Sequence, residues 1–292
     1  MAEAVSATKR PIILSCEHFS SRLIRTRQLE TLHDALSADE IKVIYYIREP
    51  SDLALAAWST RIFAGEKLKF STDDVTPENR YFNHLETLNL WGSVFGEQNL
   101  IVREYNRASL AEGDIRKDFC ALLGIQTAPM EFEEDQNQSL DAQRLQVLRY
   151  INCALSEFHE SEVEWRRAQN IRQLISTHIP SGGQLTALMS DQQRTLIKSR
   201  FATVNSEISQ RYFGGHLSRD WFPDCTVHEA KADLRHHPDI DLLSALRETV
   251  IRVADASMVP KNKRKKKSKV KNLLKRIRVR FFSAVSEPKA LQ

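Results

Sequence analysis

The chain has 292 residues, of which 41% are hydrophobic and 27% are charged, the proportions of an ordinary globular protein. These values exclude wholesale disorder, a collagen-like fibre and a disulfide-stapled miniprotein. No apolar run approaches the roughly 18 residues that a membrane span needs. The four cysteines lie far apart without a CxxC pair, so we expect reduced thiols and a cytoplasmic protein.

The net charge of +4 hides a strong asymmetry along the chain. Residues 261–280 contain 12 Lys or Arg and no acid, so the rest of the chain carries −8 once these twelve charges are subtracted. The sequence therefore predicts an acidic body and a strongly basic tail, and the overall pI says little about either.

The first 130 residues alternate strand-like runs with segments of helical period. Three short apolar runs suit buried parallel strands: residues 11–15 (PIILS), 41–47 (IKVIYYI) and 99–103 (NLIVR). Helices are expected at 53–64 with Ser51 or Asp52 as the cap, from about residue 77 through Trp91, and between Asp114 and Gly124. This alternation predicts an α/β domain on a parallel sheet over residues 1–130.

After Gly124 the pattern becomes helical, and no further convincing strand appears. An acidic linker at 131–139 precedes amphipathic helices predicted at 140–158, 185–208 and 240–253. We therefore expect residues 131–258 to form a mainly helical part of the same domain.

The tail at 259–292 begins with KNKRKKKSK, which is too charged to fold alone. The following residues place Val270, Leu274, Ile277 and Phe281 three or four apart against a basic face. Residues 261–282 therefore suit an amphipathic helix that binds an anionic membrane surface or a polyanion, and a solvated, partly disordered tail is the competing interpretation. Specific nucleic-acid binding is not expected, because the body lacks basic patches with interleaved aromatic residues.

The most informative stretch is a strand followed by Arg48, Glu49 and Pro50 and then by a helix. An arginine at the carboxyl end of a parallel strand faces the crevice in which α/β sheets bind ligands. Its guanidinium presents a planar fork to phosphate oxygens, and we expect free N–H groups at the start of the helix to add to an anion site. The alternative is an ordinary ion pair of Arg48 with Glu49 or Asp52.

The first predicted strand is followed by Glu17 and His18, a carboxylate and an imidazole where a general base would be placed. They are candidate catalytic residues, and the competing interpretation is a polar strand end. No histidine or cysteine has metal-ligand spacing, so no metal is expected. The chain contains no GxxxxGK[ST] motif.

Several of these segments, taken in order, resemble bacterial sulfotransferase-like proteins of the P-loop superfamily. The segments are IILSCEHFS, VIYYIREPSDLALAAW, FGEQNLIVREYNRASL, DFCALLGI, NQSLDAQRLQVLRYIN and VNSEISQRYFGG. Single motifs are weak, but six in order with compatible spacing are fairly specific. The resemblance covers about residues 11–222 and leaves the last seventy residues or so outside it.

The resemblance implies a partial P-loop-type three-layer parallel sheet and the donor 3′-phosphoadenosine 5′-phosphosulfate (PAPS). In such proteins an arginine at a strand end and a serine eight residues later hold the donor's 3′-phosphate. Arg48 matches the arginine, but Ala56 stands eight residues on, and Ser59 lies nearly a turn further along. The donor-binding residues implied are therefore Arg48 and, less well placed, Ser59.

The resemblance also implies an earlier strand and a glycine-rich phosphate loop, which the ten residues before Pro11 do not provide because they contain no glycine. A reading frame that starts late, a degenerate relative, and a strand supplied by another chain are the three explanations, and we favour the first. The expected function is transfer of a sulfuryl group from PAPS to a hydroxyl of a glycan or other surface molecule, provided that the loop is restored or supplied. The alternative is a non-catalytic binding module, cytoplasmic and recruited to the membrane periphery by its basic tail. A glycosyltransferase stays open as a third interpretation.

Overall fold

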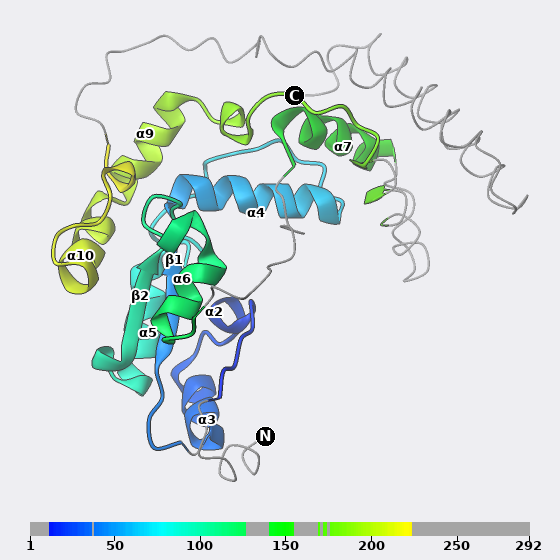
Figure 1. Ribbon diagram of the computed structural model, residues 1–292. Coiled ribbons are helices and arrows are strands. Elements are labelled where there is room, and N and C mark those ends of the chain that lie inside the picture. The colour runs from blue at the N-terminus through cyan, green and yellow to red at the C-terminus, as the bar shows by residue number, and fades with distance from the viewer. Residues whose placement is uncertain are drawn as a thin grey trace, which may run out of the picture. The chain divides into compact units, whose positions relative to one another are not determined.

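A computed structural model describes residues 12–36, 38–126, 140–154, 169, 172–173 and 176–223 (Figure 1). The chain divides into two compact units. The first unit comprises Met1–Ala54, Thr72–Glu134 and Asp191–Ala230, and the second comprises Leu55–Ser71, Asp135–Ser190 and Lys231–Gln292. Each unit is therefore discontinuous in sequence, and residues 191–230 belong with the sheet.

The first unit is built around two parallel strands, β1 (Val43–Ile47) and β2 (Leu100–Glu104). Val43 pairs with Leu100 and Ile47 with Glu104, so both strands end at the same edge. The predicted strands at 41–47 and 99–103 are confirmed to within two residues, together with their parallel direction.

Helices cover both faces of these strands. The Tyr45 hydroxyl contacts His84 at the start of α5 (His84–Phe95), 3.1 Å away, and the Tyr46 hydroxyl donates a 2.8 Å hydrogen bond to Asp118 of α6 (Ile115–Leu122). Because successive strand side chains point to opposite faces, α5 and α6 pack on opposite sides. The first unit is thus an α/β structure with a helix on each face of a small parallel sheet.

The strand predicted at 11–15 is wrong for residues 12–15, which form irregular backbone. Ile12 and Ile13 are 45% and 53% exposed, so this apolar run is not buried in a sheet. A strand needs a partner for its backbone groups, and within the described residues β1 and β2 pair with each other alone.

The core of the first unit joins α5 to α3 (Thr26–Leu36) and α10 (Ala202–Phe213). It is made of buried aliphatic and aromatic side chains: Leu29, Leu36, Ile47, Leu85, Leu88, Trp91, Phe95, Leu100, Ile208, Leu217 and Trp221. Shorter elements of this unit are α2 (Phe19–Arg22), η1 (Glu97–Asn99), η2 (Ala111–Gly113) and η4 (Arg219–Trp221).

Several predicted helices have different bounds in the structure. The helix expected from residue 77 begins at His84, because the Asn83 side chain caps it by accepting a hydrogen bond from the Glu86 amide. The helix expected at 185–208 is divided into η3 (Leu185–Leu188), α9 (Asp191–Arg200) and α10. By contrast, the Asp114 cap of α6 is confirmed, since its side chain accepts from the Arg116 amide.

The second unit packs α7 (Ala142–Ala154) with the later part of α4 (Pro50–Ala64), whose residues 50–54 belong to the first unit. Asn152 donates 2.7 Å hydrogen bonds to the carbonyl oxygens of Ile62 and Glu66 and so satisfies the carboxyl end of α4. Arg172, which is fully buried, donates from Nε to the Asn152 side-chain oxygen at 2.8 Å.

The linker at 131–139, the helix predicted at 240–253 and the basic tail at 259–292 lie outside the described residues. Across the ranges that are described, no helix combines the length and the apolar character that crossing a membrane would require.

Candidate anion site at the carboxyl edge of the sheet

Arg48 directly follows β1 and lies at the edge where both strands end. Its guanidinium carbon lies 5.4 Å from the centre of the Tyr105 ring, and Tyr105 is the first residue after β2. No ion pair of Arg48 occurs within the described part of the chain. The guanidinium is thus held against an aromatic face, which leaves its fork of N–H donors available to an anion.

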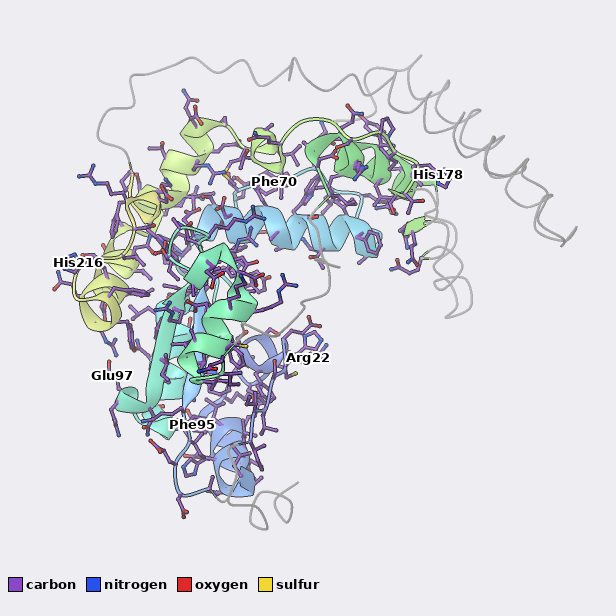
Figure 2. The ribbon with its side chains drawn as sticks, viewed as in Figure 1. Arg22, Phe70, Phe95, Glu97, His178 and His216 are labelled. Carbon is purple, nitrogen blue, oxygen red and sulfur yellow. The ribbon has the colours of Figure 1, made fainter. Side chains whose placement is uncertain are left out.

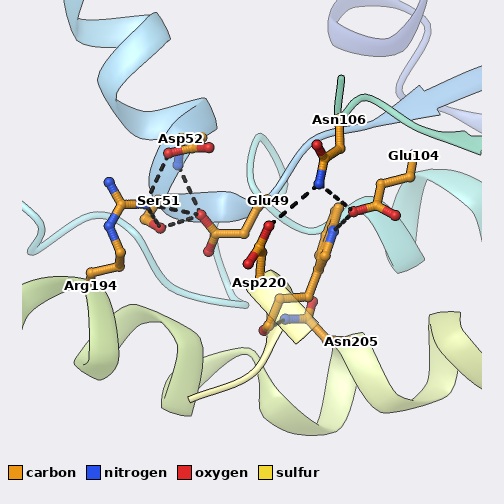
Figure 3. A network of polar contacts seen from close by, with 9 residues as sticks. Glu49, Ser51, Asp52, Glu104, Asn106, Arg194, Asn205 and Asp220 are labelled. Carbon is orange, nitrogen blue, oxygen red and sulfur yellow. Dashed lines mark hydrogen bonds and ion pairs between the residues drawn. The ribbon is translucent and has the colours of Figure 1, made fainter. Parts of the chain in front are cut away.

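The alternative pairing of Arg48 with Glu49 or Asp52 is not what the structure contains. Both carboxylates face Arg194 of α9, whose Nη1 lies 2.9 Å from Asp52 Oδ1 and 3.7 Å from Glu49 Oε2 (Figure 3). The two acids that follow Arg48 in the sequence are therefore paired with Arg194 and not with Arg48.

The start of α4 is not the open anion site that the sequence suggested. Glu49 caps the helix: its Oε2 accepts hydrogen bonds from the Ser51 hydroxyl and, at 3.1 Å, from the Asp52 amide. Pro50 has no amide hydrogen, and the Leu53 amide donates to the Glu49 carbonyl oxygen at 2.9 Å. The first N–H groups are therefore used internally, and Glu49 takes the place assigned to Ser51 or Asp52.

Burial raises the pKa of the Glu49 carboxyl, while hydrogen bonds from Ser51 and Asp52 oppose the shift. Glu49 Oε1 and Arg194 Nη2 are buried without a hydrogen-bond partner within the described residues. The cluster is consequently charged but incompletely satisfied, a few residues from Arg48.

The end of β2 carries a second buried carboxylate, Glu104, which sequence reasoning missed. Its Oε1 accepts hydrogen bonds from Trp221 Nε1 at 2.8 Å and from the Ser218 hydroxyl at 2.6 Å, and its Oε2 accepts from Ser109 at 3.0 Å. Figure 3 shows Glu104 with Asn106 and Asp220 in the same view as the Glu49 cluster. Because its oxygens are occupied, Glu104 ties η4 to the sheet and is not a free base.

The candidate catalytic pair is exposed. Glu17 Oε1 and His18 Nε2 lie 3.3 Å apart, with side chains that are 85% and 54% exposed. They precede the short helix α2 and follow irregular backbone, so no strand end positions them. These two residues are neighbours in the sequence, and no described contact joins them to Arg48.

Ser59 lies in the middle of α4 and is 9% exposed. It belongs to the second unit, whereas Arg48 belongs to the first. Within the first unit the candidate site consists of Arg48 with Tyr105, and the role of Ser59 stays a prediction. Among the residues that the structure describes, no group of three His, Cys, Asp or Glu side chains is arranged to hold a metal ion.

Comparisons with known proteins add one relative. No family model and no solved structure matches the chain. An uncharacterized protein of Archaeoglobus fulgidus is 28% identical over 136 residues, a match that covers 46% of this chain and 36% of the relative. The match spans only about a third of that protein's length, and its name carries no activity.

Proposed function

We propose that this protein binds the 3′-phosphorylated nucleotide PAPS and belongs to a sulfotransferase-like system of the P-loop type. One observation carries the proposal: an arginine without a carboxylate partner in the described residues, at the carboxyl edge of a parallel sheet. Ligands of open α/β sheets bind at this edge, and a guanidinium fork matches a phosphate. The resemblance of six ordered segments supplies the identity of the donor.

The proposed reaction moves a sulfuryl group to a hydroxyl of a glycan or other surface molecule. The hydroxyl oxygen forms a bond to sulfur while the bond from sulfur to the donor's phosphate oxygen breaks. The hydroxyl proton passes to a base, and the leaving phosphate gains the negative charge. Arg48 would anchor the donor, and no metal ion is required by this scheme.

Glu17 and His18 are the proposed candidates for the base that accepts the hydroxyl proton. Their contact at 3.3 Å places an imidazole beside a carboxylate, an arrangement suited to general-base work, and their exposure leaves them open to a bulky acceptor. The proposed reaction also needs a phosphate loop to hold the sulfated end of the donor.

Calorimetry with 3′-phosphoadenosine 5′-phosphate, the desulfated donor, tests the proposal. The control ligand is adenosine 5′-phosphate, which lacks the 3′-phosphate assigned to Arg48. We expect about 10-fold or greater preference for the 3′-phosphorylated nucleotide, the value of one charged hydrogen bond. Equal affinity for both ligands, or no binding of either, would reject the assignment.

The second candidate function is a non-catalytic module that residues 261–282 recruit to an anionic membrane or polyanion. The observation in its favour is that residues 261–280 contain 12 Lys or Arg and no acid. This second proposal implies a cytoplasmic protein at the membrane periphery. It does not imply specific nucleic-acid binding.

A further inference from the structure

A buried histidine, His84, contacts the backbone of Arg48. His84 is 6% exposed and opens α5, and its ring contacts the rings of Tyr45 and Trp221. A polar ring this deeply buried needs partners for both nitrogens. Both partners are present, and one of them is the main chain of Arg48.

The contacts of the ring determine where its proton lies. Nε2 lies 2.8 Å from the carbonyl oxygen of Arg48, and the Arg48 amide, a donor, points at the same nitrogen from 3.2 Å. Nε2 can serve only one of these two contacts, because in a neutral ring it is either a donor or an acceptor. Because a carbonyl oxygen only accepts, the shorter contact assigns the hydrogen to Nε2. Nδ1 then accepts from the Tyr45 hydroxyl, 3.1 Å away. The imidazole is neutral in this arrangement, and burial lowers the pKa of His84 to about 4.

Arg48 is the point at which the chain leaves the sheet. The Tyr105 amide donates a 2.7 Å hydrogen bond to the Ile47 carbonyl oxygen at the end of the strand pair, and α4 begins at Pro50. The direction of the Arg48 side chain depends on its backbone, which is bonded to His84 rather than lying within a regular strand. His84 contacts the Arg48 backbone and Tyr105 contacts the guanidinium, so the two residues together set where the guanidinium lies.

We propose that His84 is a positioning residue that orients Arg48 for the phosphate of the nucleotide. The inference rests on the proposed function, since it concerns how that same site is organised. His84 touches no ligand in this account. It acts through the hydrogen bond from Nε2 to the Arg48 carbonyl oxygen, so a side chain that keeps a donor at this place should keep the affinity.

The test compares His84→Gln, whose terminal amide can reach the Arg48 carbonyl oxygen, with His84→Asn and His84→Leu, which cannot. We expect the affinity for 3′-phosphoadenosine 5′-phosphate to fall about 10-fold in His84→Asn and His84→Leu, as for one lost hydrogen bond. His84→Gln should stay within about threefold of the unchanged chain. If His84→Leu does not fold, the Gln and Asn variants carry the comparison.

Two controls separate positioning from loss of stability. Phe95→Leu changes the buried far end of the same helix (Figure 2) and should lower the melting temperature without changing affinity. In an Arg48→Ala background, His84→Asn should have no further effect on binding.

The outcomes distinguish the two proposals. Absence of binding by the unchanged chain rejects the proposed function and, with it, the role of His84. Binding that requires Arg48 but is equal in His84→Gln and His84→Asn, or that falls equally in Phe95→Leu, overturns the inference on His84 alone.

Discussion

At the scale of single residues, the buried imidazole of His84 makes stability depend on acid. Burial lowers the pKa of His84 from 6.5 to about 4, so the unfolded chain takes up a proton in this interval and the folded chain does not. Stability is therefore lost as pH falls from 6.5 towards 4, by about 3 kcal/mol over the full interval.

Chemical denaturation across this pH range measures the effect. The loss attributable to His84 should be absent in His84→Gln, whose side chain does not titrate. Parallel pH curves for the two proteins would contradict the buried, neutral assignment. The comparison of the two curves removes the contributions of other titrating groups that both proteins share.

The surroundings of Arg48 show which features of the site could be predicted from the sequence. Arg48 could be placed at a strand end because a short apolar run and the residue after it are local features. The partners that define its surroundings are distant: His84 is 36 residues away from Arg48, Arg194 is 143 from Ser51 and Trp221 is 117 from Glu104. No pattern of spacing connects such pairs, so the ion pair of Arg48 with its neighbours looked equally plausible.

At the scale of elements, the end of α4 was predictable but its support was not. Gly65 directly follows the helix predicted at 53–64, and it has φ +114°, a conformation that favours glycine. A Cβ built there would lie 2.5 Å from Nη2 of Arg172, which is fully buried against it. Gly65→Ala should therefore strain the backbone and displace the guanidinium.

We expect Gly65→Ala to lower the free energy of unfolding by about 2–3 kcal/mol, from backbone strain together with disturbed packing. Gly124→Ala is the matched control, because Gly124 also has positive φ but nothing lies within 4 Å of its Cβ. It should cost only the backbone part, about 1 kcal/mol. Equal losses in thermal denaturation of the two variants would show that the Arg172 contact does not matter.

Elements also show why an apolar run is not sufficient for a strand. The runs at 41–47 and 99–103 form β1 and β2 because they pair with each other and helices pack on them. Residues 12–15 have similar composition, yet they lie exposed without a strand partner in the described chain. Pairing is a long-range property, which local propensity cannot supply.

At the scale of the whole molecule, charge is divided between an acidic body and a basic tail. The 12 positive charges of residues 261–280 predict sedimentation with vesicles that contain phosphatidylserine, and not with vesicles of phosphatidylcholine alone. A version lacking residues 261–282 should lose this binding and keep its affinity for the nucleotide. Removal of residues 283–292, which contain none of the twelve, is the control. Unchanged sedimentation without residues 261–282 would refute the role of the tail.

If Arg48 forms the anion site, its removal must weaken nucleotide binding more than the removal of another positive charge does. Calorimetry with 3′-phosphoadenosine 5′-phosphate would compare the unchanged chain, Arg48→Ala and Arg27→Ala, the last removing an equal charge from an exposed position on α3. We expect the affinity for this nucleotide to fall about 10- to 100-fold in Arg48→Ala alone, as for charged hydrogen bonds. Equal affinities in all three proteins would contradict it.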